Sequence, residues 1–432
     1  MQSLKTTDII ALGFMTFALF LGAGNIIFPP LVGQGAGAHM WSAAAGFLLT
    51  GVGLPLATVV ALARVGGGLD ALTQPIGRAA GVSLGVLVYL AIGPLFATPR
   101  TATVSFEVGL APFVDSASQG SVLFAYSLVY FGVVMLIALF PGKLIDTVGK
   151  YITPVLIIGL ILMGAAAFLL PAGVVQPPTE AYLDAALGQG FVQGYQTMDA
   201  LGALVFGIVI VNAIRDRSVS DRGLQTRYAI IAAIIAAVGL ALVYVSLVYL
   251  GATSGSLAPG ATTGVPILTQ FVQHTFGTFG SVLLALVITL ACLTTAVGLV
   301  CACGEYFSRI LPVSYRTIVI TFSLFSMVVA NQGLEQLIAV SLPVLIGVYP
   351  VAITLVALSL MDHFWVRSSR VFKPTMLVAA VCGVLDGVAT AGFDLNLPTW
   401  FTELPGAALG LGWLTPVLLT WAVAAVADRV RG

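Results

Sequence analysis

Apolar stretches alternate with short polar segments along almost the whole chain. A helix that crosses the hydrocarbon core of a bilayer needs roughly 20 predominantly apolar residues. Windows of this kind fall near residues 9–32, 41–63, 82–113, 122–141, 151–171, 191–214, 228–250, 278–304, 315–331, 335–360, 374–391 and 407–427. The pattern predicts an all-α polytopic membrane protein with twelve transmembrane helices in a single transmembrane domain, residues 1–432.

The composition excludes a soluble protein and a nucleic-acid-binding protein. Only 8% of the residues are charged and 59% are hydrophobic, with a mean hydropathy of +1.08, whereas a soluble domain carries about 25% charged residues. The 17 Lys+Arg balance the 17 Asp+Glu, so no basic surface is available to neutralise nucleic-acid phosphates. The cysteines lie in apolar stretches without a histidine nearby, and we expect neither a metal cluster nor a cofactor.

The basic residues fall on one predicted side of the membrane. With the N-terminus inside, the inner segments carry every lysine and arginine except Arg100: Lys5, Arg64, Arg78, Lys143, Lys150, Arg215, Arg217, Arg222, Arg227, Arg309, Arg316, Arg367, Arg370, Lys373, Arg429 and Arg431. The outer loops instead carry the acidic residues Asp115, Glu180, Asp184, Glu335, Asp394 and Glu403. The positive-inside rule therefore predicts that both termini are cytoplasmic.

A few charged residues lie inside the apolar spans. They are Arg100, Glu107, Asp199 and Asp386. A charge in a bilayer is costly, so such residues usually face a cavity and act on a substrate or an ion. Arg100 and Glu107 are candidates for a gate; the alternative is that Arg100 pairs with Asp386 or Asp199 and only fixes its helix. For Asp386 we expect a pairing role, and for Asp199 a functional one.

The first span contains a helix-weakening sequence near its middle. Gly22 and Gly24 flank Ala23 and precede Asn25, and Pro29 and Pro30 follow. One interpretation is close helix packing, which glycines permit. The alternative is a break whose freed carbonyls coordinate a small cation, while the N-terminus of the second half-helix holds a carboxylate.

The sixth span carries a second polar interruption, residues 194–202, which includes Asp199. It comes five spans after the first, and because five is odd, a repeat of the first five helices would be inverted in the membrane. We therefore predict one repeat over about 8–171, a second over about 191–360, and two extra helices over about 374–427.

The eighth span contains two adjacent threonines, Thr294 and Thr295. A threonine in a membrane helix most often bonds the carbonyl four residues earlier in its own helix. Facing an unwound run of carbonyls, the two hydroxyls would instead suit a hard cation that prefers oxygen ligands.

Long motifs resemble those of the bacterial branched-chain amino acid:cation symporters. They include DIIALGFMTFALFLGAGNIIFPP (8–30), GPLFATPRTATVSFEVG (93–109) and GYQTMDALGALVFGIVIVNAIR (194–215), and the resemblance covers essentially the whole chain. It implies import of leucine, isoleucine and valine across the bacterial cytoplasmic (inner) membrane, coupled to Na⁺ or, in some members, to H⁺. It also implies similarity to the amino acid–polyamine–cation superfamily, which has the leucine-transporter fold of five-plus-five inverted helices.

The resemblance to that fold implies a set of site residues. Those implied to contact the substrate are Phe20, Gly22, Ala23, Gly24, Thr197, Met198, Asp199 and Gly202. Those implied to bind Na⁺ are Ala18, Leu21, Ala291, Thr294 and Thr295, with Asn25 at a further cation site. Met198 stands where the fold has a threonine ligand of that further site. We infer, beyond the resemblance, that Asp199 beside it supplies the negative charge, either as a cation ligand or as the partner of the substrate ammonium group.

These observations favour a secondary transporter that works by alternating access over the other classes of protein. A channel would need a continuous polar stripe, which no span has, and an enzyme would need paired acids or a nucleophile with its base. H⁺ coupling, or another small neutral amino acid as cargo, are the alternatives within the same fold. We infer the lipid bilayer as surroundings and no obligatory protein partner.

Overall fold

A computed structural model describes residues 4–140, 156–215, 217, 219, 221–393 and 403–431. All regular secondary structure in these ranges is helical. The start of the predicted span 151–171, and the loop residues Lys143, Lys150 and Asp394, lie outside the described residues.

The helices of the first part of the chain begin with two short ones in place of one long span. The elements are α1 Thr6–Phe20, α2 Ala23–Ala36, η1 Gly37–His39, α3 Met40–Leu48, η2 Leu49–Gly53, α4 Leu54–Val65, α5 Leu69–Leu72, η3 Gln74–Ile76, α6 Arg78–Leu90, η4 Ala91–Leu95, α7 Ala97–Gly109, η5 Ala111–Phe113, η6 Ser116–Ser118 and α8 Gln119–Leu139.

The second part contains the two longest helices. An apolar helix over Leu156–Leu169 comes first. It is followed by α10 Glu180–Leu183, α11 Ala186–Gln193, η7 Gly194–Thr197, α12 Asp199–Arg215, α13 Arg222–Ser254, α14 Gly264–Ile310, α15 Tyr315–Ala330, α16 Leu334–Leu360, η8 Asp362–Phe364, α17 Ser368–Thr390, η9 Ala407–Leu409 and α19 Leu414–Arg431.

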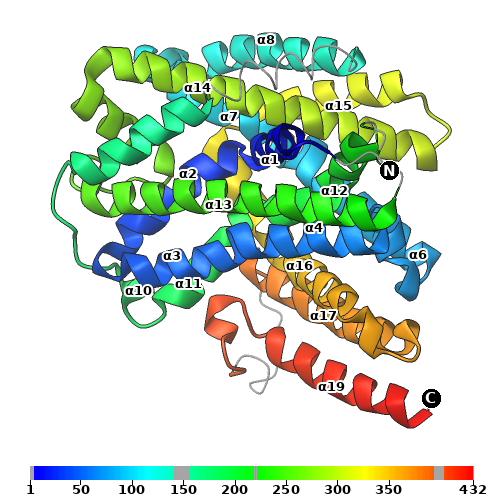
Figure 1. Ribbon diagram of the computed structural model, residues 1–432. Helices are drawn as coiled ribbons and strands as arrows, with labels where there is room; N and C mark the ends of the chain where they lie inside the picture. Colours follow the sequence, from blue (N-terminus) through cyan, green and yellow to red (C-terminus); the bar gives the residue numbers. More distant parts are fainter. Residues whose placement is uncertain are drawn as a thin grey trace.

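The long helices lie side by side across the view of Figure 1, as expected for a bundle that crosses a bilayer. By length and composition, seven helical stretches could cross a membrane, or eight if the bent pair Ala186–Thr197 and Asp199–Arg215 is one span. Shorter apolar helices cover Thr6–Phe20, Leu156–Leu169 and Tyr315–Ala330. The count of twelve stays a prediction.

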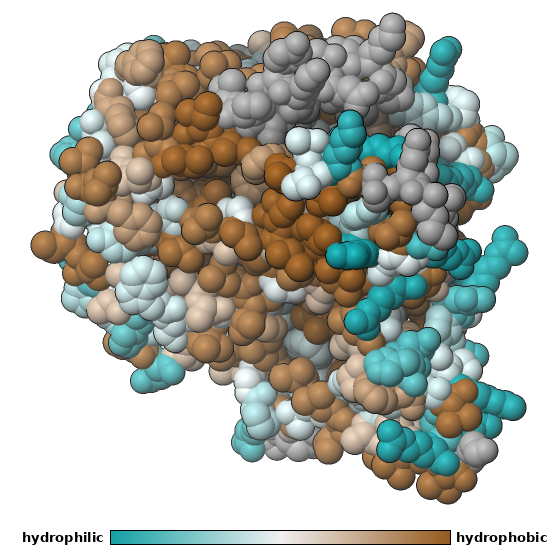
Figure 2. Space-filling view, in the orientation of Figure 1, coloured by the Kyte–Doolittle hydropathy of each residue, from teal (hydrophilic) through white to brown (hydrophobic). Residues whose placement is uncertain are grey.

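The surface separates apolar from polar residues. In Figure 2 brown, hydrophobic residues cover the middle of the face, while the strongest teal gathers along the right-hand edge. Figure 1 marks both chain ends at that same edge. Exposed arginines at helix ends agree with this separation: Arg64 near the end of α4, Arg78 at the start of α6, and Arg309 near the end of α14. The side of the membrane that this edge faces stays a prediction.

Two predicted spans are less regular than their hydropathy indicates. Window 82–113 is divided into α6, a π-helical turn and α7, because Gly93 has non-helical φ/ψ and Pro94 lacks a backbone donor. The helix α14 bends at Gly277, where φ is 64°. The arm before this bend was not predicted, since its residues are too polar to read as a membrane span.

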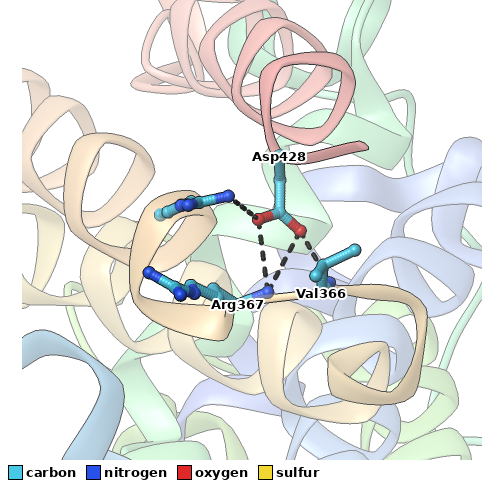
Figure 3. Close-up of polar contacts among 4 residues, drawn as sticks. Val366, Arg367 and Asp428 are labelled. Atoms are coloured by element: carbon cyan, nitrogen blue, oxygen red, sulfur yellow. Dashed lines mark hydrogen bonds and ion pairs between the residues drawn. The ribbon is translucent and has the colours of Figure 1, made fainter. Parts of the chain in front are cut away.

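One buried carboxylate of the C-terminal helix bonds the segment that leads into α17 (Figure 3). Asp428 of α19 is 1% exposed. It accepts hydrogen bonds from the backbone N–H of Val366 at 2.7 Å and of Arg367 at 3.2 Å. Arg370 of α17 forms an ion pair with it, with 3.7 Å between Nη1 and Oδ1. Asp428 therefore joins α19 to the segment that leads into α17.

Candidate functional site

Two helix breaks lie against each other in the bundle. Between α1 and α2, Leu21 and Gly22 have extended φ/ψ. Between η7 and α12, Met198 has φ 63°, the sole positive value among the described non-glycine residues. A Cβ built on Gly24 would lie 3.0 Å from Thr197 Cα and 3.1 Å from the Gln196 carbonyl oxygen. Glycine at position 24 therefore lets the two breaks come into backbone contact.

A buried polar cluster connects these breaks to α13. Asn25 Oδ1 accepts the Gly22 N–H at 2.9 Å, which satisfies a free donor at the start of α2. Asn25 Nδ2 donates to Asp199 Oδ2 at 2.7 Å and also to the Tyr244 hydroxyl. Tyr244 in turn donates to Asp199 Oδ2. Asp199 is 4% exposed, and it lies in the first turn of α12, where the helix dipole stabilises a negative charge.

A cavity opens beside this cluster, and the two breaks form much of its wall. It is lined by Leu19, Phe20, Gly22, Ala23, Gly24, Asn25, Ile92, Ala97, Arg100, Thr101, Thr197, Met198, Asp199, Gly202, Phe206, Thr295 and Leu299. All eight residues predicted to contact the substrate are therefore brought together around one cavity, with Asn25 and Thr295 beside them.

The oxygen atoms predicted to bind Na⁺ are also partly assembled. The Thr295 hydroxyl of α14 lies 3.2 Å from the Leu21 carbonyl oxygen and 3.1 Å from that of Ala291. The Thr294 hydroxyl donates to the Ala291 carbonyl at 2.8 Å, three residues earlier, and the bond of Thr295 to Ala291 is the one that spans the predicted four residues. Ala18 lies in the last turn of α1, on the chain segment that leads to Leu21. Hydroxyl and carbonyl oxygens are the ligands that hard cations prefer, so this donor set fits Na⁺.

The two gate candidates lie in different surroundings. Arg100 is 2% exposed and lines the cavity, whereas the partly exposed Glu107 does not. Arg100 Nη1 donates to the Gln196 carbonyl and Nη2 to the Ser341 hydroxyl, both at 2.7 Å. The predicted alternative was an ion pair of Arg100 with Asp199 or Asp386. It is wrong, because the ion pairs among the described residues are Arg309–Glu305 and Arg370–Asp428. Backbone and hydroxyl oxygens satisfy the guanidinium instead.

Several residues of the site were not predicted from the sequence. Tyr244 is one of several tyrosines in its apolar stretch, and nothing local distinguishes it. Ser341 is likewise a small polar residue within the apolar stretch that forms α16. Phe206 lines the cavity and packs edge-on against Phe20, with ring centroids 6.3 Å apart. For Tyr244 and Ser341 the available signal was a polar side chain within an apolar span, and such side chains are too common in this sequence to select these two positions.

The geometry defines a class of membrane transporter. The C-terminal end of α1 and the N-terminal end of α2 meet at one cavity within an apolar bundle, where the carbonyl groups of one helix end suit a cation and the N–H groups of the other suit an anion. Solved structures agree with this fold. MhsT in complex with L-phenylalanine matches with TM-score 0.61 at 15% identity, over 96% of this chain and 98% of that one. The nucleobase-cation-symport-1 transporter MHP1, with bromovinylhydantoin bound, matches with TM-score 0.55 at 13% identity, over 98% and 92%.

The particular family follows from sequence comparison. The family of branched-chain amino acid transport proteins matches residues 5–431, and the chain belongs to it. The branched-chain amino acid transport system 2 carrier protein of Pseudomonas aeruginosa is 62% identical over 100% of this chain and 98% of its own length. The branched-chain amino acid permease BrnQ of Escherichia coli K12 is 56% identical with the same coverage. The chain is therefore a multi-pass membrane transporter, as the resemblance in its motifs predicted.

Proposed function

We propose that this protein imports leucine, isoleucine and valine across the bacterial inner membrane by Na⁺-coupled symport. The two relatives described above are a carrier and a permease for branched-chain amino acids, and both match over the whole chain. Identity above half of all positions supports the same substrate class here.

The substrate occupies the cavity between the two helix breaks. Backbone groups of Phe20, Gly22, Ala23 and Gly24 face its polar end, and the second break supplies Thr197, Met198, Asp199 and Gly202. The aliphatic side chain packs against apolar neighbours such as Phe206 and Leu299. Each buried CH₂ contributes about 0.8 kcal/mol, so leucine and valine differ by only ~1 kcal/mol and are both carried.

Na⁺ binds between α1 and α14. Its ligands are the carbonyl oxygens of Ala18, Leu21 and Ala291 and the hydroxyls of Thr294 and Thr295. The observation that carries this assignment is the Thr295 hydroxyl, which lies within 3.2 Å of the Leu21 carbonyl on the unwound segment. A cation at this point organises the break that the substrate also contacts, and this couples the two binding events.

The transport cycle follows from the proposed symmetry. The twelve helices comprise two inverted repeats of five and two extra helices, with both termini cytoplasmic. The first, second, sixth and seventh predicted spans rock against the third, fourth, eighth and ninth, so that the cavity opens alternately to each side. The juxtaposed breaks in the first and sixth predicted spans support this arrangement, since such breaks lie at the repeat interface in transporters of this kind.

H⁺ coupling is the second candidate, and a specific observation favours it. Asp199 is a buried carboxylate at the break, bonded to Asn25 and Tyr244. A proton bound there would change the charge of the cavity during transport.

Uptake of labelled leucine into proteoliposomes distinguishes the candidates. Vesicles that contain purified protein receive an inward Na⁺ gradient, an inward H⁺ gradient or neither, at equal membrane potential. Our proposal predicts accumulation with the Na⁺ gradient alone, inhibited by unlabelled isoleucine and valine. Accumulation driven only by the H⁺ gradient would favour Asp199 as the coupling group, and inhibition by alanine or serine but not by isoleucine would refute the substrate class.

A further inference from the structure

The guanidinium of Arg100 forms part of the cavity wall although it is deeply buried. Arg100 is 2% exposed, and its side chain reaches the cavity from α7. Its Cζ also lies 5.2 Å from the centre of the Phe28 ring of α2. Arg100 thus touches three other elements that surround the site: η7 through Gln196, α16 through Ser341, and α2 through Phe28.

The positive charge of Arg100 has no anionic partner within the described ranges. Its two hydrogen-bond acceptors are a carbonyl and a hydroxyl, and its Nε, also buried, has no hydrogen-bond partner there. Removing one member of a buried charge pair is strongly unfavourable, because the remaining charge is neither hydrated nor compensated. An arginine held in this state inside a transporter's cavity is suited to a ligand that carries the missing negative charge.

We propose that Arg100 binds the α-carboxylate of the transported amino acid; this rests on the proposed function. The guanidinium presents a planar set of donors that matches a carboxylate, and such charge-assisted hydrogen bonds are the strong ones. The N-terminal end of α2, at Ala23 and Gly24, lines the same cavity and adds N–H groups favourable to an anion. Asp199 lies in the same wall and receives the α-ammonium group. The cavity therefore carries one charge of each sign for the two charges of the substrate.

A purely structural role accounts for only part of these contacts. The bonds to Gln196 and Ser341 hold the second break against α7 and α16, and a neutral donor could make them. These two bonds do not explain why Arg100 carries a full positive charge or why it lies on the cavity wall. Carboxylate binding accounts for both.

Ligand pairs that differ only in the carboxylate separate these roles. Leucine and leucinamide have the same size and the same ammonium group, but the amide is neutral where leucine is negative. Affinities for both are measured by isothermal titration calorimetry on purified wild-type protein and on Arg100→Gln. Breaking a buried charge pair lowers affinity by about 30-fold or more. We expect wild type to favour leucine by at least this factor, and Arg100→Gln to lose the preference through weaker leucine binding, with leucinamide unchanged.

Two outcomes overturn the inference. One is a wild-type protein that binds leucinamide as tightly as leucine. The other is an Arg100→Gln protein in which both ligands weaken by the same factor, as a structural role predicts. Unchanged leucinamide binding also shows that the variant is folded. Should Arg100→Gln not fold, Arg100→Lys keeps the charge without the planar fork: about a tenfold loss for leucine alone supports carboxylate binding, and an equal loss for both ligands refutes it.

The matched control is Arg64→Gln, which removes an exposed arginine and leaves both affinities unchanged. Failure of the proposed function is distinguishable, because a wild-type protein that binds no branched-chain amino acid refutes that proposal before Arg100 is tested. Leucine binding in wild type with a preference that survives Arg100→Gln refutes only the role of Arg100.

Discussion

Replacing Thr295 by valine removes the oxygen that lies between the broken first helix and α14. Valine has nearly the same shape, so packing is retained while the contacts to the Leu21 and Ala291 carbonyls, at 3.2 and 3.1 Å, are lost. For folding, the cost is about 0.5–1.5 kcal/mol, that of an ordinary hydrogen bond. For Na⁺ the loss is larger, because an interaction with a charged group contributes about 1.5–3 kcal/mol. We therefore expect the Na⁺ concentration for half-maximal leucine uptake to rise about 10- to 100-fold.

The assay is labelled leucine uptake into proteoliposomes over a series of external Na⁺ concentrations. Thr294→Val gives a smaller shift, because the Thr294 hydroxyl bonds only the Ala291 carbonyl, whereas the Thr295 hydroxyl also contacts the Leu21 carbonyl of the unwound segment. Thr269→Val is the matched control: its hydroxyl also bonds its own helix, in the arm of α14 before the bend, and its Na⁺ dependence stays that of wild type. An unchanged Na⁺ dependence in Thr295→Val would refute the cation site.

Three further substitutions test other parts of the account. Gly24→Ala places a methyl group 3.0 Å from backbone at the second break and should lower leucine uptake about 10- to 100-fold, whereas Gly132→Ala, with open space around it, should not; equal uptake would contradict the close approach. Asp199→Asn removes the acidic charge from the cavity and should weaken leucine binding by about 30-fold or more in titration calorimetry; wild-type affinity would exclude an ammonium contact. Asp428→Asn should destabilise the protein by about 1–3 kcal/mol, seen as a lower thermal midpoint by tryptophan fluorescence, with leucine affinity retained. Exposed Asp362→Asn is its control, and an equal loss in both would refute the special role of the buried carboxylate.

The local sequence was sufficient to locate both helix breaks. Gly22, Gly24 and Asn25 interrupt one apolar run, and Asp199 interrupts another, where hydrocarbon makes unsatisfied backbone costly. Because each signal lies within a few residues, it can be read without knowledge of the fold. In the structure, both interruptions line one cavity.

Contacts between distant segments could not be predicted in the same way. Tyr244 of α13 bonds Asn25 of α2 and Asp199 of α12, and Arg100 is satisfied by Gln196 and Ser341 rather than by an acid. Hydropathy reports only that a residue is polar within an apolar run, not which helix faces it. The bend at Gly277 was missed for a related reason, since the polar arm before it resembles a loop.

Leucine-dependent uptake of radioactive Na⁺ is the most direct test of coupling. Proteoliposomes are held at zero membrane potential with Na⁺ at low concentration outside, and leucine is added to the external medium. Symport predicts that leucine increases Na⁺ entry in wild type and that the increase is lost in Thr295→Val. Leucine entry without any leucine-dependent Na⁺ entry in wild type would contradict Na⁺-coupled symport.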